Sequence, residues 1–257
     1  MLRQIISCFL VFSVLLLTAC SDPGLSSPPK TTQSTEAQAK ATPTKEPVKP
    51  PVTNKTSEPT AIKVPSNPLT AKLPQLNGSA TVQMKLKSGT VTIEVDGNNA
   101  PITAGNFVDL VSRGVYNGLT FHRVVKDPSP FVAQGGDPLG NGTGSFIDPV
   151  TAQPRYIPLE ILPVGKNEAV YGEILPATNK PKLQHSRGAI AMARSQMPNS
   201  ASSQFYFALA DIYFLDGSYA VFGYVTNGMD LVDGIQAGDR IESMTIVKGA
   251  ENLKQPA

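Results

Sequence analysis

Three stretches decide how this chain of 257 residues is interpreted: FHRVV at 121–125, FVAQGGD at 131–137 and NSASSQFYF at 199–207. Each stretch sets polar side chains among aromatic and apolar neighbours. Apolar walls with a few convergent polar groups are typical of a binding pocket. Because the stretches contain no Ser/His/Asp set, metal-ligand cluster or phosphate loop, they predict a pocket that holds an apolar group and donates hydrogen bonds to it.

The periodicity around these stretches predicts a mainly β fold. Apolar and polar residues alternate over 81–86 and 91–95, which predicts a hairpin across Ser88-Gly89. Further strands are predicted at 121–125, 131–133, 189–193, 203–209, 220–225 and 240–247. Helical spacing predicts one helix between Pro101 and Gly114 and a short one over 229–235. Many short strands with two helices favour a closed antiparallel barrel with helical caps.

The chain between 144 and 186 is irregular and rich in proline and glycine. Long loops of this kind in compact domains are usually functional or mobile. We interpret 145–186 as an insertion on the surface of the barrel. The Gly-rich run at 140–144 lacks the lysine of a P-loop and the strand–loop–helix setting of a dinucleotide site, so nucleotide binding is not predicted.

The first residues predict a lipoprotein signal peptide over 1–19. Arg3 precedes an apolar run over 5–17, which is too short for a membrane span of about 20 residues. The run ends in LTAC at 17–20, which resembles the lipobox of bacterial lipoproteins. The resemblance implies that Cys20 carries the lipid, palmitate included, and anchors the protein on the periplasmic side of a bacterial membrane. An ordinary secretion signal with a chance cysteine is the alternative.

The domain organisation follows from composition. Residues 20–76 are rich in Pro, Thr, Ser and Lys and nearly lack aromatic residues, which predicts a disordered tether after Cys20. The folded domain is predicted over 77–250, with a C-terminal tail over 251–257. The two cysteines, Cys8 and Cys20, both precede the domain, so no disulfide and no cysteine metal ligand are expected within it.

Charge and histidine content exclude further classes of function. The net charge is +2, but residues 77–257 carry fourteen Lys and Arg against sixteen Asp and Glu, a balance of −2. Nucleic acid is therefore not expected as a partner, because its binding favours a basic patch. The chain has two histidines, His122 and His185, so a histidine-based metal site is not expected either.

Arg123 is the most informative single residue, because arginine between apolar neighbours in a strand is rarely buried without a partner. Its guanidinium cannot act as a base, but it is a rigid and permanently charged set of donors. A salt bridge to a barrel acid or a solvated edge position would explain Arg123 without any function. Gln134 could likewise pair with backbone, and His122 could belong to the core or support the site from behind.

The stretch from about 79 to 249 resembles the cyclophilin family of peptidyl-prolyl isomerases. Its motifs are matched in order by FHRV at 121–124, the pocket segment at 131–137, MAR at 192–194, NSASSQF at 199–205, and LDG at 215–217 with VFG at 221–223. The resemblance implies an eight-stranded antiparallel barrel capped by two helices. It also implies cis/trans rotation about X–Pro bonds of proline-containing polypeptides, without a cofactor or a metal.

The resemblance also assigns roles to individual residues. The catalytic residues that it implies are Arg123, Phe131 and Gln134. The substrate-binding residues that it implies are His122, Val132, Ala193, Arg194, Gln204, Tyr206, Phe214, Leu215 and Tyr219. Arg123 would donate a hydrogen bond toward the prolyl nitrogen as the amide twists, which stabilises the transition state without a covalent step. The apolar residues would hold the proline ring, while Ala193 and Arg194 would offer main-chain hydrogen bonds to the peptide.

Several positions depart from the animal-type pattern of the family. Phe214 stands in place of Trp, which argues against tight cyclosporin binding, and Tyr219 stands in place of His. Tyr206 replaces Phe on the pocket floor, so its hydroxyl needs a partner or a water. Residues 126–130 add about three positions between Arg123 and Phe131.

Two hypotheses about function follow. The first is a monomeric isomerase that assists the folding of extracytoplasmic proteins. The alternative is a non-catalytic peptide-binding or assembly module that uses the same groove or the insertion at 145–186. The intact set of Arg123, Phe131 and Gln134 favours the first.

Overall fold

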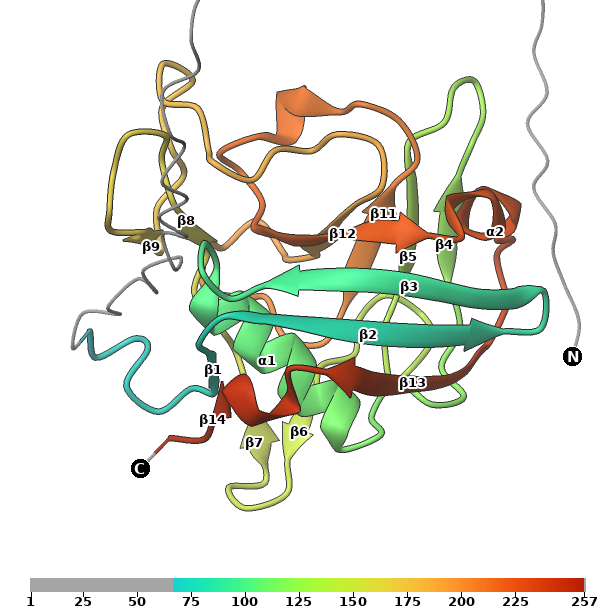
Figure 1. Cartoon of the computed structure of the whole chain (residues 1–257), viewed down its shortest axis with the longest axis horizontal. Helices are drawn as coiled ribbons and strands as arrows, with labels where there is room; N and C mark the ends of the chain where they lie inside the picture. The colour runs from blue at the N-terminus through green and yellow to red at the C-terminus, as the bar shows by residue number, and fades with distance from the viewer. Residues whose placement is uncertain (1–66, 257) are drawn as a thin grey trace, which may run out of the picture. The chain divides into compact units, whose positions relative to one another are not determined.

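The computed structural model describes residues 67–256, which form a mainly β fold with two α-helices (Figure 1). The predicted signal peptide at 1–19, the lipidation site Cys20 and the tether up to residue 66 lie outside the described residues. Within 67–256, no helix is both long enough and apolar enough to cross a membrane.

The central feature is one antiparallel sheet of eight strands, in the order β13-β2-β3-β12-β10-β11-β5-β4. Its strands are β2 (Ser79–Leu86), β3 (Gly89–Asp96), β4 (Arg123–Val125), β5 (Val132–Gly135), β10 (Ala189–Met192), β11 (Phe205–Ala208), β12 (Val221–Asn227) and β13 (Ile241–Lys248). Each predicted strand corresponds to one of these, so the mainly β prediction is confirmed. Alternation places Val82, Met84, Ile93 and Val95 on the buried face of β2 and β3.

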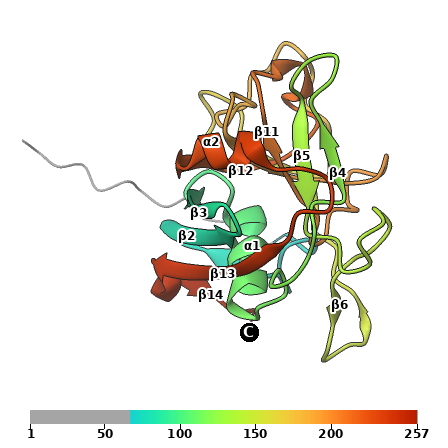
Figure 2. The same ribbon diagram turned by 90° about the vertical axis from the view of Figure 1, so that its right-hand side faces the viewer.

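The prediction of a closed barrel was too strong, because the sheet curls only into a half-barrel (Figure 2). Its edge strands β4 and β13 meet through an isolated bridge between Thr120 and Arg240. Backbone bonds such as Phe121 N to Asp239 O, at 2.9 Å, surround this bridge. Gly238, whose φ of +93° suits glycine, donates its N–H to the carbonyl of Phe121 at 2.9 Å in the same short stretch. No continuous ladder therefore joins the two edges.

Aromatic side chains pack between the sheet and helix α1 (Pro101–Ser112) to form the centre of the core. The Phe107 ring on α1 lies 5.7 Å from that of Phe205 on β11 and 5.0 Å from that of Phe222 on β12. Phe121 is fully buried and makes an edge contact with Phe205. The first of the three defining stretches thus begins in the core, and this places Arg123 two residues further on at the surface.

Helix α1 starts at Pro101 as predicted, but the group that accepts its first N–H bonds comes from elsewhere in the chain. Ala100 at the N-cap offers no side-chain acceptor. Instead the fully buried Glu160 accepts hydrogen bonds from the backbone N–H of Ile102, at 3.1 Å, and of Thr103, at 2.7 Å. The Tyr171 hydroxyl donates a third bond to Glu160. Burial raises the pKa of Glu160, and these hydrogen bonds oppose that rise.

The region 145–186, interpreted above as an irregular surface insertion, contains two small antiparallel sheets. One pairs β6 (Ile147–Asp148) with β7 (Gln153–Pro154), and the other pairs β8 (Glu160–Ile161) with β9 (Val170–Tyr171). Leu159, Ile161 and Leu175 from this region are buried. The insertion is therefore packed onto the domain, with its own apolar cluster.

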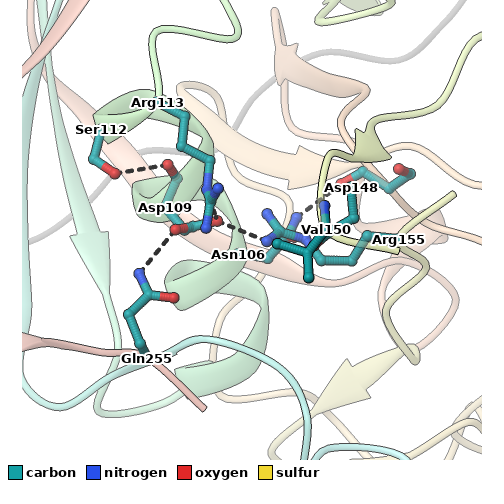
Figure 3. Close-up of polar contacts among 9 residues, drawn as sticks. Asn106, Asp109, Ser112, Arg113, Asp148, Val150, Arg155 and Gln255 are labelled. Carbon is teal, nitrogen blue, oxygen red and sulfur yellow. Dashed lines mark hydrogen bonds and ion pairs between the residues drawn. The ribbon is translucent and has the colours of Figure 1, made fainter. Parts of the chain in front are cut away.

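A polar cluster around the buried Asp109 ties three parts of the chain together (Figure 3). The Asp109 carboxylate on α1 accepts hydrogen bonds from Arg113 Nε at 2.8 Å, Arg155 Nη1 at 2.6 Å and Gln255 Nε2 at 2.9 Å. Burial alone would raise the pKa of Asp109, but these bonds hold it below its usual value. One carboxylate thus connects the helix, the insertion and the end of the chain.

Ordered structure extends past the predicted bounds of 77–250 at both ends. Strand β1 (Gln75–Leu76) pairs with β14 (Leu253–Lys254), which follows the short 3₁₀ turn η2 (Ala250–Asn252). Leu76 is fully buried, so the last residues assigned to the tether belong to the core. Helix α2 (Met229–Gly234) lies where the second helix was predicted, and the 3₁₀ turn η1 (Tyr213–Leu215) precedes β12.

Candidate active site

Strand register brings the three defining stretches side by side. Arg123 on β4 is paired with Gln134 on β5, and Gln134 is paired with Tyr206 on β11. Arg123 Nη1 donates a long hydrogen bond of 3.4 Å to Gln134 Oε1, and Gln134 Nε2 donates to Gln204 Oε1 at 3.1 Å. In this series of hydrogen bonds, Gln204 orients Gln134, and Gln134 orients Arg123, which is exposed to solvent.

Apolar side chains form a cluster next to these hydrogen bonds. Val132 and Tyr206 are buried, and the partly buried Phe131, Ala193, Leu215 and Tyr219 pack against the same cluster. The guanidinium carbon of Arg123 lies 5.8 Å from the centre of the Phe131 ring. Phe131 in turn stacks on Phe214, with ring centres 5.9 Å apart. A permanently charged donor therefore lies at the edge of this apolar cluster.

The hydroxyl of Tyr206 finds its partner in a buried histidine. His185 Nε2 lies 2.9 Å from the Tyr206 hydroxyl, and His185 Nδ1 lies 2.7 Å from Asp216 Oδ1. Because an ionised carboxylate can only accept, Nδ1 carries the proton and Nε2 accepts the proton of the tyrosine. Burial lowers the pKa of His185, although Asp216 opposes this, and burial raises the pKa of Tyr206 well above its usual value.

Sequence reasoning missed His185 and Asp216 as part of the site. His185 was considered only as a metal ligand, and Asp216 only as part of a matched motif. The one available signal was the tyrosine itself, since a hydroxyl in an apolar floor requires a partner. Nothing in the sequence indicated which residue would supply it.

Arg194 and Ala193 form the wall beside Tyr219. Arg194 donates from Nε and Nη2 to the carbonyl of Ser218, at 2.9 and 2.6 Å, and its guanidinium lies 4.7 Å from the centre of the Tyr219 ring. The N–H of Ala193 already donates to the carbonyl of Gln204 at 2.9 Å. That N–H is therefore not available for the main-chain contact predicted for Ala193, and the contact would use the carbonyl oxygen of Ala193 instead.

A cavity of about 310 Å³ adjoins this wall and Gln134. Its other side includes Gly142 and Gly144, whose carbonyls accept hydrogen bonds from Gln204 Nε2 at 3.1 and 2.9 Å. The loop is held in shape by Asp137, which accepts bonds from the N–H groups of Leu139, Asn141 and Gly142. The Gly-rich run considered above as a nucleotide loop is thus a wall of the candidate site.

His122 lies beside Gly142. Its two ring nitrogens are buried and have no hydrogen-bond partner among the described residues. Burial lowers the pKa of His122, which favours the neutral ring. Within 67–256 no group of three or more His, Cys, Asp or Glu side chains could hold a metal ion.

Comparison with known proteins places the chain in a family. The model of the family described as cyclophilin type peptidyl-prolyl cis-trans isomerase/CLD matches residues 81–251. A Synechocystis sp. protein named as a thylakoid lumen peptidyl-prolyl cis-trans isomerase is 45% identical over 196 residues, which are 71% of this chain and 51% of that protein. A chloroplastic peptidyl-prolyl cis-trans isomerase of Arabidopsis thaliana is 41% identical over 206 residues, 72% of this chain and 46% of that protein.

A solved structure shares the fold. The crystal structure of a cyclophilin type peptidyl-prolyl cis-trans isomerase from Cryptosporidium parvum superposes with a TM-score of 0.53 at 24% identity, covering 66% of this chain and 98% of that one. The present chain spans about half the length of the two curated relatives. It belongs to the cyclophilin-type peptidyl-prolyl cis-trans isomerase family.

Proposed function

We propose that this protein catalyses cis/trans rotation about X–Pro bonds. The uncatalysed barrier of about 18–20 kcal/mol arises from amide resonance. Twisting the amide makes the prolyl nitrogen pyramidal and basic, so a donor aimed at it stabilises the transition state more than the ground state. The observation that carries the proposal is the position of Arg123, beside the apolar cluster that contains Phe131, Val132 and Tyr206, and hydrogen-bonded to Gln134.

The remaining predicted residues take roles that suit their positions. Phe131, Val132, Tyr206 and Leu215 hold the proline ring, and Phe214 and Tyr219 extend the apolar surface. Gln134 and Gln204 orient Arg123 and contact substrate backbone, as does the carbonyl of Ala193. Arg194 and His122 support the walls on either side. The reaction needs no cofactor, because only hydrogen bonds and apolar contacts change along it.

The test is exchange spectroscopy by NMR on an Ala-Pro peptide with the purified protein and with Arg123→Ala. Loss of one transition-state donor should lower kcat/KM by about 10²–10³-fold. Arg187→Ala is the matched control, because Arg187 forms an exposed ion pair with Asp233 and should leave the rate nearly unchanged. If the wild-type protein shifts peptide signals without speeding exchange, the domain is the non-catalytic binding module instead.

We further propose that the protein works as a monomer outside the cytoplasm, anchored through acyl chains on Cys20, with proline-containing polypeptides as clients and no nucleic acid as a partner. The LTAC stretch at 17–20 supports the anchor, and the lumenal name of the Synechocystis relative supports the location. Acyl chains contribute about 0.8 kcal/mol per buried CH₂, so several make a firm anchor. A mature N-terminal peptide whose mass lacks acyl groups would exclude this.

A further inference from the structure

A second cavity, of about 560 Å³, adjoins the candidate site at Phe214. It shares no lining residue with the 310 Å³ cavity beside Gln134. We call it the insertion groove, because one side comes from 145–186 and the other from the loop that carries η1. Its lining includes Asn179, Lys180, Gln184, Tyr213, Phe214 and Asp216.

The two sides of the insertion groove are held together by hydrogen bonds. Leu175 N donates to the carbonyl of Gly217 at 3.0 Å, and Ile212 N donates to the carbonyl of His185 at 2.8 Å. His185 N donates to Asp216 Oδ1 at 2.8 Å. Gly217 packs so closely that a side chain there would meet Leu175 at 3.1 Å. The groove is therefore formed in advance of any ligand.

One ring joins the groove to the apolar cluster of the candidate site. Phe214 is 74% exposed and Tyr213 is 49% exposed, although both are large aromatic side chains. Phe214 stacks on Phe131, which packs against the apolar cluster of the candidate site. Aromatic side chains left exposed beside a binding pocket are enriched where a polypeptide binds.

The lining of the groove contains two charged side chains, Lys180 and Asp216. Lys180 is exposed and forms no ion pair among the described residues. The backbone of Lys180 is fixed, because its carbonyl accepts a hydrogen bond from Val164 N at 2.9 Å. The Asp216 side chain is only 12% exposed, and its Oδ1 accepts two hydrogen bonds from His185. Lys180 is therefore the more accessible of the two charged groups for a ligand in the groove.

We propose that the insertion groove is a substrate subsite that binds the polypeptide on one side of the proline, with an apolar side chain on Tyr213 and Phe214 and a carboxylate at Lys180. The proposal rests on the proposed isomerase function, since it extends the same bound chain beyond the proline ring. It gives the insertion a role in choosing substrates with an acidic residue a few positions from the proline.

The experiment compares Ala-Pro peptides that differ only in one residue. Glu, Ala or Lys is placed two to four positions before or after the proline, and kcat/KM is measured by NMR exchange. On one side of the proline, Glu should exceed Ala by about two- to fivefold, the size of an exposed ion pair. Lys180→Glu should reverse that order in favour of Lys. Lys182→Glu is the matched control, because Lys182 is exposed nearby but does not line the groove.

The outcomes separate the subsite from the proposed function. A short Ala-Pro peptide without flanking residues should be turned over equally by wild type and Lys180→Glu, which also shows that the variant is folded. If that peptide is turned over but Lys180→Glu leaves the charge preference unchanged, or Lys182→Glu changes it equally, the subsite is excluded. If nothing is turned over, amide shifts of 177–184 on titration with the Glu and Lys peptides still decide whether the groove binds.

Discussion

The hydroxyl of Tyr206 adds a polar group to the floor of the proposed proline pocket. Where the family pattern has Phe, this chain carries an extra O–H that would be costly to bury without a partner. The hydroxyl donates to His185, and His185 donates to Asp216. The floor is therefore fixed by a buried network as well as by packing. Its central residue is a histidine that must stay neutral for Nε2 to accept.

This network predicts a pH dependence of stability. Burial lowers the pKa of His185 below its unfolded value of about 6.5, so the unfolded chain binds the proton first. The free energy of unfolding should fall as the pH drops below about 6.5, by at most about 1.4 kcal/mol per pH unit for this one proton. Urea unfolding between pH 7.5 and 5.5, followed by circular dichroism, measures the slope.

The variant His185→Gln isolates the contribution of this residue. His122, also with a lowered pKa, acts in the same direction, whereas Glu160, with a raised pKa, acts in the opposite one. The contributions of His122 and Glu160 are the same in both proteins, so they cancel when the slope of His185→Gln is subtracted from that of wild type. A slope that is identical in the two proteins would contradict the assignment of His185 as a buried neutral acceptor.

At the scale of elements, helix α1 depends on an acceptor supplied by the insertion. Glu160 lies 58 positions beyond Ile102 in the sequence, yet it satisfies two of the helix's first N–H groups. These groups have no acceptor within the helix itself. The insertion therefore contributes to the fold of the domain as well as to its surface.

Glu160→Gln tests this cap. An amide offers one acceptor oxygen, so one backbone N–H would face an NH₂ group and remain unsatisfied in a buried place. We expect the free energy of unfolding to fall by about 1–3 kcal/mol, measured by urea unfolding with tyrosine fluorescence, since the chain has no Trp. Glu168→Gln, an exposed site in the same insertion, should change it little. If the two substitutions lowered the free energy of unfolding equally, the hydrogen bonds from Glu160 would not stabilise the start of α1.

The eight main strands and both α-helices could be predicted because their signal is local. Alternation over 81–86 and helical spacing after Pro101 report burial on one face directly. The short pairs β6–β7, β8–β9 and β1–β14 were missed because two-residue strands have no period to read. The barrel was predicted to be closed because no local pattern in the sequence marks where the pairing between the two edges of the sheet ends.

At the scale of the whole domain, Asp109 connects parts that are far apart in sequence. Arg155 comes from the insertion and Gln255 from the end of the chain, and both reach the same carboxylate on α1 (Figure 3). The Arg155 side chain is only 8% exposed, and its guanidinium also lies 4.6 Å from the centre of the Phe146 ring. The cluster fixes the insertion against the helix.

Asp109→Asn should destabilise the whole domain. The substitution leaves the buried guanidinium of Arg155 without its carboxylate, and breaking a buried pair in this way costs about 3–5 kcal/mol. The free energy of unfolding in urea measures the loss. Glu242→Gln is the control, because Glu242 pairs with Lys85 at an exposed site and should cost less than about 1 kcal/mol. A loss for Asp109→Asn no larger than for the control would show that the cluster adds no stability.

The sequence by itself determined the class of fold, the order of its main elements and the stretches that converge on the pocket. Periodicity, turn residues and motif order are local properties, and Arg123, Phe131 and Gln134 lie within one short segment. Only the tertiary structure decided that His185 meets Tyr206, that Glu160 caps α1 and that the insertion meets Phe214 in a groove. These contacts join positions 21 to 58 residues apart, and their geometry depends on the path of the whole chain. No pattern along the sequence specifies that path.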